Sequence, residues 1–81
     1  MKKSELKQRL INENVRSDVY ALEGGLPSEA YCLNYNGFEW EVYYSERGTK
    51  TGLKNFNTED EACDYFYNSL IKMLREMGLI V

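Results

Sequence analysis

The dipeptide Asn36-Gly37 constrains this chain more than any other feature, because it lies between two runs rich in aromatic and β-branched residues. An Asn-Gly pair in that setting predicts a β-hairpin with a two-residue type I′ turn. Three pairs of opposed residues follow from that turn: Tyr35 with Phe38, Leu33 with Trp40, and Tyr31 with Val42.

Side chains alternate across a strand, so the two runs divide between the two faces of the predicted hairpin. One face is aromatic and apolar, and we expect it to be the core side: Tyr31, Leu33, Tyr35, Phe38, Trp40, Val42 and Tyr44. The other face is polar and acidic, and we expect it to face solvent as a display face: Cys32, Asn34, Glu39, Glu41, Tyr43 and Ser45.

Two helices are expected at the ends of the chain. Ser4 predicts the N-cap of a helix over residues 4–13, and Asn14 can adopt the left-handed conformation that ends it, with Val15 closing a Schellman-type contact. Thr58 and Glu61 form the pattern of a capping box at the start of a second helix, which Gly78 should stop.

The second helix has an apolar stripe at helical spacing, about 120° wide, which indicates a core-facing side. Its members are Ala62, Cys63, Phe66, Leu70, Met73, Leu74 and Met77. Cys63 is therefore expected to act as a small buried hydrophobe. Tyr65 and Ile71 lie outside the stripe and are either isolated exposed residues or an interaction edge.

The remaining segments suggest a meander of strands. A short strand is expected over Val19–Leu22, followed by a connecting loop over residues 24–28, which contains the chain's one proline. If Arg47-Gly48 forms the tip of a second turn, Tyr44 would pair with Thr51 and Val42 with Leu53, in a strand over residues 50–56. That register is open, because Gly48 could instead occupy a bulge position.

The predicted fold is therefore α+β: an N-terminal helix, a three- or four-stranded antiparallel β-meander and a C-terminal helix, with both helices on one face of the sheet. The chain has 81 residues, of which 43% are hydrophobic, so we expect one small domain spanning residues 1–81. The two cysteines are expected to be reduced thiols. The charged N-terminus lacks the apolar run of a signal peptide, and no stretch could span a membrane, so a cytoplasmic location is expected.

The distribution of charge disfavours a nucleic-acid ligand. Residues 23–64 carry nine acidic and three basic side chains, a net charge of −6, while the whole chain has a net charge of −3. Phosphate contacts need a basic surface, and no basic residue occurs between Tyr31 and Tyr44. An acidic surface instead favours association with a basic partner.

No catalytic or metal-binding pattern is present in the sequence. The chain has no histidine, so the usual proton shuttle and the commonest metal ligand at neutral pH are missing. Two separated cysteines make no recognisable zinc site, and no serine or cysteine has a plausible activating base. We therefore expect no enzyme activity, no cofactor and no metal, and interpret the chain as a binding protein.

Residues 20–67 resemble a group of small bacterial immunity proteins that are encoded beside polymorphic toxins, including those of contact-dependent growth inhibition systems. The resemblance lies in Trp40–Gly48, in Phe56 followed by an acidic helix start, and in Glu61-Ala62-Cys63 with Tyr65-Phe66. It implies a cytoplasmic inhibitor that binds the C-terminal domain of a cognate toxin. Many such toxins are nucleases with basic surfaces, which would suit the acidic middle of this chain.

Six residues are the candidates for contact with such a partner: Asn34, Glu39, Glu41, Tyr43, Glu46 and Arg47. The first four belong to the display face, where a tyrosine among acids suits a hot spot with a polar rim. The other two lie in the second turn, where they are either surface charges of a structural turn or contacts to the partner. We expect a monomer or a weak dimer.

Two other functions remain open. A small non-catalytic interaction or regulatory module, pairing as a homodimer through an exposed sheet edge, is the first alternative. A nucleic-acid-binding domain is the second, and the charge argues against it.

Overall fold

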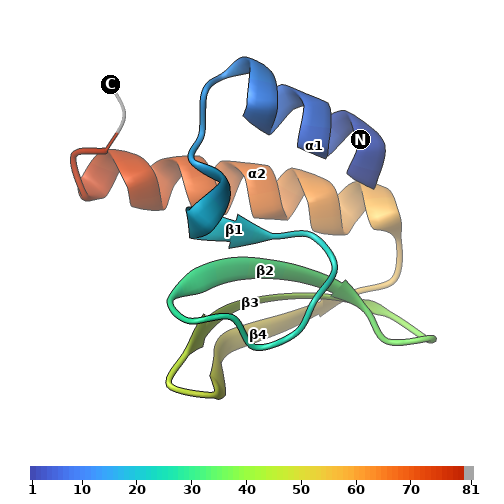
Figure 1. Cartoon of the computed structure of the whole chain (residues 1–81). Coiled ribbons are helices and arrows are strands. Elements are labelled where there is room, and N and C mark those ends of the chain that lie inside the picture. The colour runs from blue at the N-terminus through green and yellow to red at the C-terminus, as the bar shows by residue number, and fades with distance from the viewer. Residues whose placement is uncertain (80–81) are drawn as a thin grey trace.

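The computed structural model describes residues 1–79 and has two helices and a four-stranded sheet (Figure 1). The elements are α1 (Lys3–Asn12), a 3-10 turn η1 (Ser17–Val19), β1 (Tyr20–Ala21), β2 (Ala30–Tyr35), β3 (Trp40–Glu46), β4 (Thr49–Phe56) and α2 (Glu59–Glu76). The predicted α+β class and the order of its helices and strands are confirmed.

The sheet is mixed, so the predicted fully antiparallel meander is wrong at its first strand. The strand order is β1-β2-β3-β4; β2, β3 and β4 are antiparallel neighbours, but β1 runs parallel to β2. A parallel pair needs a connection that returns along the sheet before the next strand starts. Residues 22–29, which we call the covering loop, make that return, and a length of eight residues suffices because β1 has only two.

The register of the β2–β3 hairpin differs from the prediction by two residues. Tyr35 pairs with Trp40 rather than Phe38, and a four-residue loop over 36–39 replaces the two-residue turn. The side chain of Asn36 explains this loop, because its Oδ1 accepts hydrogen bonds from the amides of Phe38 (2.9 Å) and Glu39 (2.8 Å). A shift of two residues keeps every paired side chain on its predicted face, but it removes Phe38 from the strand.

The second hairpin follows the predicted turn and then departs from the predicted register. Arg47 and Gly48 both have positive φ, as a type I′ tip requires, and Tyr44 pairs with Thr51 as expected. Beyond that pair, a bulge sets Val42 opposite Lys54 instead of Leu53. Gly52 has a φ of 64° there and provides the left-handed residue of the bulge.

Helix α1 begins with Lys2 as its N-cap, so the prediction of Ser4 at that position is wrong. The amide of Lys2 donates to Glu5 Oε1 at 3.2 Å, and the amide of Lys3 donates to Glu59 Oε2 at 2.7 Å. Glu59 belongs to α2, so this cap is a tertiary contact that local sequence could not reveal. At the other end Asn14 has a φ of 57°, and the amide of Val15 donates to the carbonyl of Leu10, which confirms the Schellman-type end.

Helix α2 is capped as predicted but is buried over a broader face. The Glu61 amide donates to Thr58 Oγ1 at 3.2 Å, and Gly78 follows the helix with a φ of 74°. Ile71, predicted to lie outside the buried stripe, is only 8% exposed, whereas Met77, a member of that stripe, is 61% exposed. Ile71 is buried because α1 packs along α2 and covers this flank. Met77 is the C-cap residue, beyond the end of the helix.

The core lies between α2 and one face of the sheet, with α1 packed on α2 (Figure 1). Leu33 and Val42 point to α2 from the sheet, and Leu6 and Leu10 join the same cluster from α1. Cys63 is fully buried in this cluster, as predicted. Helix α1 packs against α2, and its expected place on the same face of the sheet stays a prediction.

Candidate functional site

The face of the sheet that was expected to be the display face is covered by residues 22–29. Tyr43 is 1% exposed, and its hydroxyl donates to the carbonyl of Gly25 at 2.6 Å. Ser45 is fully buried and donates from Oγ to the carbonyl of Pro27 at 2.7 Å. The prediction that Tyr43 is an exposed hot spot is therefore wrong, because the covering loop crosses this face on its way from β1 to β2.

Asn34 and Glu41, two further residues of the predicted display face, hold the loops in place. Glu41 is 8% exposed, and its carboxylate accepts from Asn34 Nδ2 (2.9 Å), Asn36 Nδ2 (3.2 Å) and Lys50 Nζ (3.4 Å). The hydrogen bond from Asn34 is the main cause that lowers the pKa of Glu41. Asn34 also packs against Gly24, where a Cβ would lie 2.3 Å from Asn34 Oδ1. Glu41 is thus a structural anchor rather than an exposed acid.

The other predicted contact residues lie far apart. Glu39 is next to the first residue of β3, whereas Glu46 is its last residue and Arg47 lies in the turn beyond. Seven residues of strand separate the two ends by roughly 20 Å. Glu46 accepts a hydrogen bond from the Thr51 hydroxyl at 3.3 Å, and Arg47 is exposed at the tip. The six predicted residues are therefore spread along the hairpin, and two of them, Glu41 and Tyr43, are buried.

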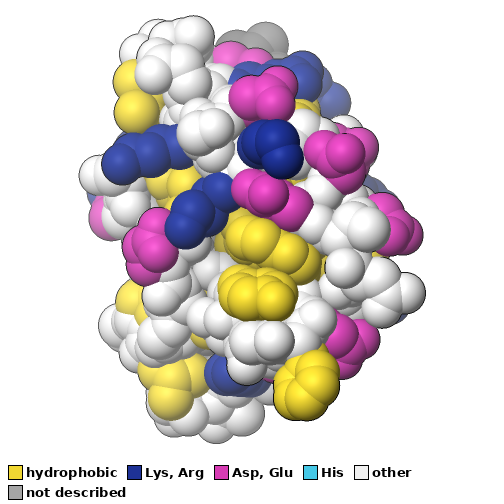
Figure 2. Space-filling view, turned by 90° about the vertical axis from the view of Figure 1, so that its right-hand side faces the viewer, with side chains coloured by type: hydrophobic (Ala, Val, Ile, Leu, Met, Phe, Trp, Pro, Cys, Tyr) yellow, Lys and Arg dark blue, Asp and Glu magenta, His cyan; other side chains and the backbone are white. Residues whose placement is uncertain are grey.

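An exposed group of aromatic side chains lies instead at the end of the sheet that carries the β2–β3 loop. We call Tyr35, Phe38 and Trp40 the aromatic patch. Phe38 is 89% exposed, Tyr35 is 54% exposed, and the ring of Tyr35 lies 5.0 Å from that of the half-buried Trp40. Figure 2, which faces this end of the molecule, shows a group of hydrophobic side chains near its centre and a separate hydrophobic side chain below it, with charged side chains of both signs above and beside them.

Phe38 was predicted to be in the core, and its exposure follows directly from the four-residue loop. The loop is well held: the Asn36 amide donates to the carbonyl of Glu39 at 3.0 Å, and the Asn36 side chain bonds to the loop amides and to Glu41. The residue in the sequence that could have indicated this loop is Asn36. An asparagine side chain can accept hydrogen bonds from amides two and three residues ahead, and this arrangement competes with the tight turn that the dipeptide Asn-Gly favours. The hydrogen bonds of Asn36 thus fix the loop that carries the exposed Phe38.

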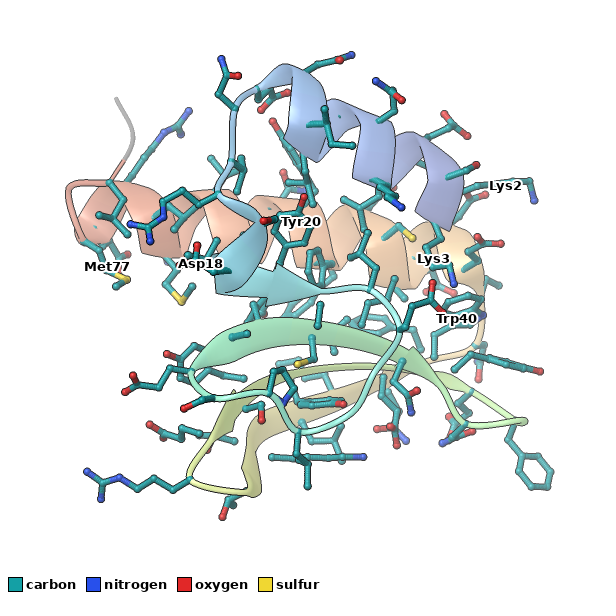
Figure 3. All side chains as sticks on the ribbon, viewed as in Figure 1. Lys2, Lys3, Asp18, Tyr20, Trp40 and Met77 are labelled. Atoms are coloured by element: carbon teal, nitrogen blue, oxygen red, sulfur yellow. The ribbon has the colours of Figure 1, made fainter. Side chains whose placement is uncertain are left out.

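Charged groups of both signs surround the aromatic patch. Glu39 adjoins Phe38 and accepts from Asn55 Nδ2 at 3.1 Å. Trp40 lies at the end of the molecule where α1 and α2 begin, as do Lys2 and Lys3 (Figure 3). There the exposed Asp60 lies 2.8 Å from the N-terminal ammonium, and this interaction raises the pKa of the ammonium group to about 10.

Within residues 1–79 we find no arrangement that indicates catalysis. No group of three or more metal-ligating side chains comes together in that part of the chain. Burial raises the pKa of both cysteine thiols, that of Cys63 to about 11, so neither has the thiolate character of a nucleophile. Neither helix is long and apolar enough to cross a membrane, as far as the described residues go.

Comparisons with known proteins do not add an assignment. No protein-family model matches the chain, and searches of curated proteins and of solved structures found no match. The candidate site therefore rests on the geometry of the aromatic patch and on the charges beside it.

Proposed function

We propose that this protein is an immunity protein, which binds the C-terminal domain of a cognate bacterial toxin and neutralises it by stoichiometric association in the cytoplasm. The observation that carries the proposal is the 89% exposure of Phe38 on a loop that is fixed by its own hydrogen bonds. The resemblance of residues 20–67 to immunity proteins supplies the class of partner.

The aromatic patch has the features of a protein-binding hot spot. Tyrosine and tryptophan are enriched in such hot spots, which are surrounded by a polar rim. Phe38 sits in a loop that needs no reordering on binding, so its burial would not be offset by the cost of fixing a mobile segment. Glu39 is the one predicted contact residue that adjoins the patch, and it stays a candidate as part of the rim.

The acidic middle of the chain supports a basic partner, such as a nuclease domain. Residues 23–64 carry a net charge of −6, and Glu39 in this segment adjoins Phe38 of the patch. Glu59 and Asp60, at the start of α2, contact Lys2 and the N-terminal ammonium. Acidic surfaces steer basic partners and increase the rate of association, and added salt reduces this effect. Glu46 and Arg47, at the far end of β3, would then lie outside the interface.

Self-association through the long edge strand is less well supported. β4 is the exposed edge of the sheet, and its charged residues are Lys50 and Lys54. If two copies paired antiparallel about Gly52, Lys50 of each would face Lys54 of the other, and like charges directly opposite are destabilising. This observation favours a monomer that binds another protein over the alternative of a homodimeric module.

The test is co-expression with the toxin-like domain encoded beside this protein, followed by calorimetric titration of the purified pair. We expect a one-to-one complex and loss of toxicity. Phe38→Ala should weaken binding by about 2 kcal/mol, roughly 30-fold, and leave the melting temperature nearly unchanged. The matched control is Leu53→Ala, which truncates a half-exposed apolar residue on β4 and should change the affinity less than about twofold.

Two results would count against the proposal. Absence of binding and of neutralisation by the wild-type protein would remove the immunity function. Binding that Phe38→Ala leaves unchanged would keep the function and exclude the aromatic patch as its site.

A further inference from the structure

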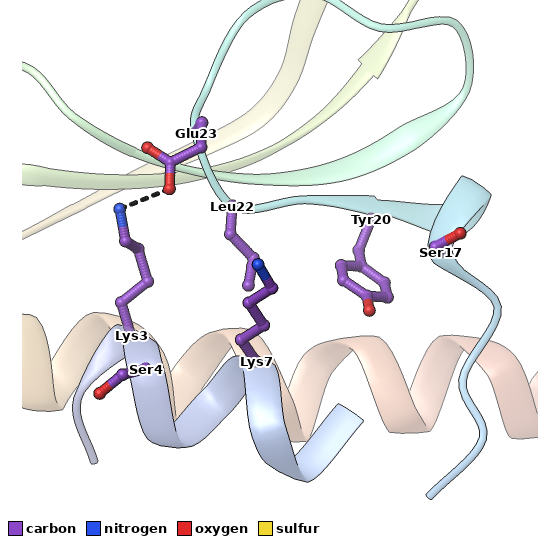
Figure 4. Close-up of a pocket in the computed structure, with 7 residues that line it drawn as sticks. All are labelled: Lys3, Ser4, Lys7, Ser17, Tyr20, Leu22 and Glu23. Carbon is purple, nitrogen blue, oxygen red and sulfur yellow. Dashed lines mark hydrogen bonds and ion pairs between the residues drawn. The ribbon is translucent and has the colours of Figure 1, made fainter. Parts of the chain in front are cut away.

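A groove between α1 and β1 forms a second candidate binding site, separate from the aromatic patch. It encloses about 460 Å³, a volume typical of ligand sites. Figure 4 shows the side chains that line it, which come from α1 on one side and from η1, β1 and the start of the covering loop on the other: Lys3, Ser4, Lys7, Ser17, Tyr20, Leu22 and Glu23.

The polar groups of this groove are arranged to receive carboxylates. Lys3 Nζ already holds one, because it donates to Glu23 Oε1 at 2.7 Å (Figure 4). Glu23 is itself largely exposed and can leave this contact at little cost. Among the described residues, Lys7 Nζ makes no hydrogen bond or ion pair, although it lies in the same groove. Of the two ammonium groups in the groove, only that of Lys3 therefore has a carboxylate partner among the described residues.

The spacing of these lysines matches an extended chain. Lys3 and Lys7 are four residues apart on α1, so their positions differ by about 6 Å along the helix axis. Side chains two residues apart on one face of a strand are separated by about 6.6 Å. An extended segment with acidic residues at alternate positions can therefore direct one carboxylate to each lysine, while its own backbone follows β1.

The lip of the groove is suited to such a segment. β1 is an edge of the sheet and pairs only with β2. Backbone groups that point away from β2 can pair with an added strand, which is a common mode of peptide recognition. Tyr20 and Leu22 supply apolar surface beneath the segment.

We infer that the groove between α1 and β1 binds an extended acidic segment of a protein partner, with acidic side chains at alternate positions contacting Lys3 and Lys7. This partner segment is acidic, whereas the partner expected at the aromatic patch is basic. The inference therefore does not depend on the immunity function, and its test uses this protein alone with a synthetic peptide.

The probe is a blocked peptide, acetyl-Thr-Glu-Val-Glu-Val-Glu-Thr-amide, titrated into the isotope-labelled protein and followed by amide chemical shifts. We expect shifts at Lys3, Ser4, Lys7 and residues 20–22, and binding that weakens as salt is added. The control peptide carries Gln at each Glu position and should bind at least about fivefold more weakly, the contribution of an exposed ion pair.

Two pairs of variants separate the groove from the general charge of the protein. Lys7→Gln should lower the affinity for the peptide about fivefold. The control Gln8→Glu makes the same change in net charge on α1 outside the groove, and it should change the affinity less than about twofold. Glu23→Gln should strengthen binding about two- to fivefold by freeing Lys3, and the control Glu46→Gln should not. The inference is overturned if the two peptides bind alike, if the shifts lie on another surface, or if Lys7→Gln and Gln8→Glu have equal effects.

Discussion

The two hydroxyl groups that hold the covering loop decide whether the second face of the sheet is structural or available to a partner. Tyr43→Phe removes only the oxygen that donates to Gly25, and Ser45→Ala removes the oxygen that donates to Pro27. Both side chains are essentially inaccessible to solvent, but the two hydrogen bonds are only partly buried, so water can replace the lost donors in part. Both changes leave the packing around the site almost unaltered.

The expected loss follows from these contacts. A hydrogen bond contributes about 1 kcal/mol net, and an acceptor left without a partner costs about 1–3 kcal/mol, with a partly exposed carbonyl in the lower part of that range. We expect each variant to lose about 1–2 kcal/mol of unfolding free energy, and the double variant about 2–3 kcal/mol. Because the two bonds hold the same loop, the double loss should differ from the sum of the single losses by about 0.5 kcal/mol or more.

The assay is urea unfolding followed by the fluorescence of Trp40, the only tryptophan in the chain. The control is Tyr35→Phe, which removes a hydroxyl from a 54% exposed tyrosine on the same hairpin and should cost less than about 0.5 kcal/mol. Toxin binding should be unchanged in Tyr43→Phe. If this variant instead kept full stability and lost toxin binding, Tyr43 would be a contact residue and the loop would not cover it in solution.

Two further predictions concern the same region. The pKa of Glu41 is lowered from 4.5 in the folded protein, so its contribution to stability is present above that pH and is lost as the pH falls through the folded-state pKa. Between about pH 6 and pH 3, the free energy of unfolding measured in urea should therefore fall less in Glu41→Gln than in the wild type or in Glu39→Gln. Equal decreases of the unfolding free energy in all three proteins would contradict the role of Glu41. Gly24→Ala should cost about 2–4 kcal/mol, because its Cβ meets Asn34 Oδ1 at 2.3 Å and its φ is 73°. Gly25→Ala, with a φ of 84° and no atom within 4 Å of its Cβ, should cost about 1–2 kcal/mol, so similar losses of unfolding free energy in the two variants would refute the packing argument.

Elements whose signals lie within a few residues were predicted well. The cap at Thr58, the helix end at Asn14 and the turn tip at Arg47-Gly48 all depend on contacts between near neighbours. These contacts form whenever the local segment adopts its conformation, whatever the rest of the chain does. Sequence patterns therefore report them directly.

The tip of the first hairpin shows where local signals compete. Asn36-Gly37 fits both a two-residue turn and a loop in which the Asn36 side chain bonds to the amides ahead of it. The second arrangement also gives Asn36 Nδ2 a partner in Glu41 and keeps Leu33 and Val42 paired beneath α2. The choice of loop exposes Phe38 and creates the aromatic patch, so the candidate site depended on a register that the dipeptide alone left undecided.

That Asn36-Gly37 joins two strands, and which side chains share each face, follows from local sequence, because strand alternation is a property of the backbone. That the polar face is covered does not, because the contacts of Tyr43 and Ser45 with Gly25 and Pro27 join residues 18 apart in the chain. In the alternating pattern of a strand, a polar side chain that hydrogen-bonds to water cannot be distinguished from one that hydrogen-bonds to a backbone carbonyl. Its partner is fixed when a distant segment packs against it, and here that segment is the loop that connects the parallel strands β1 and β2.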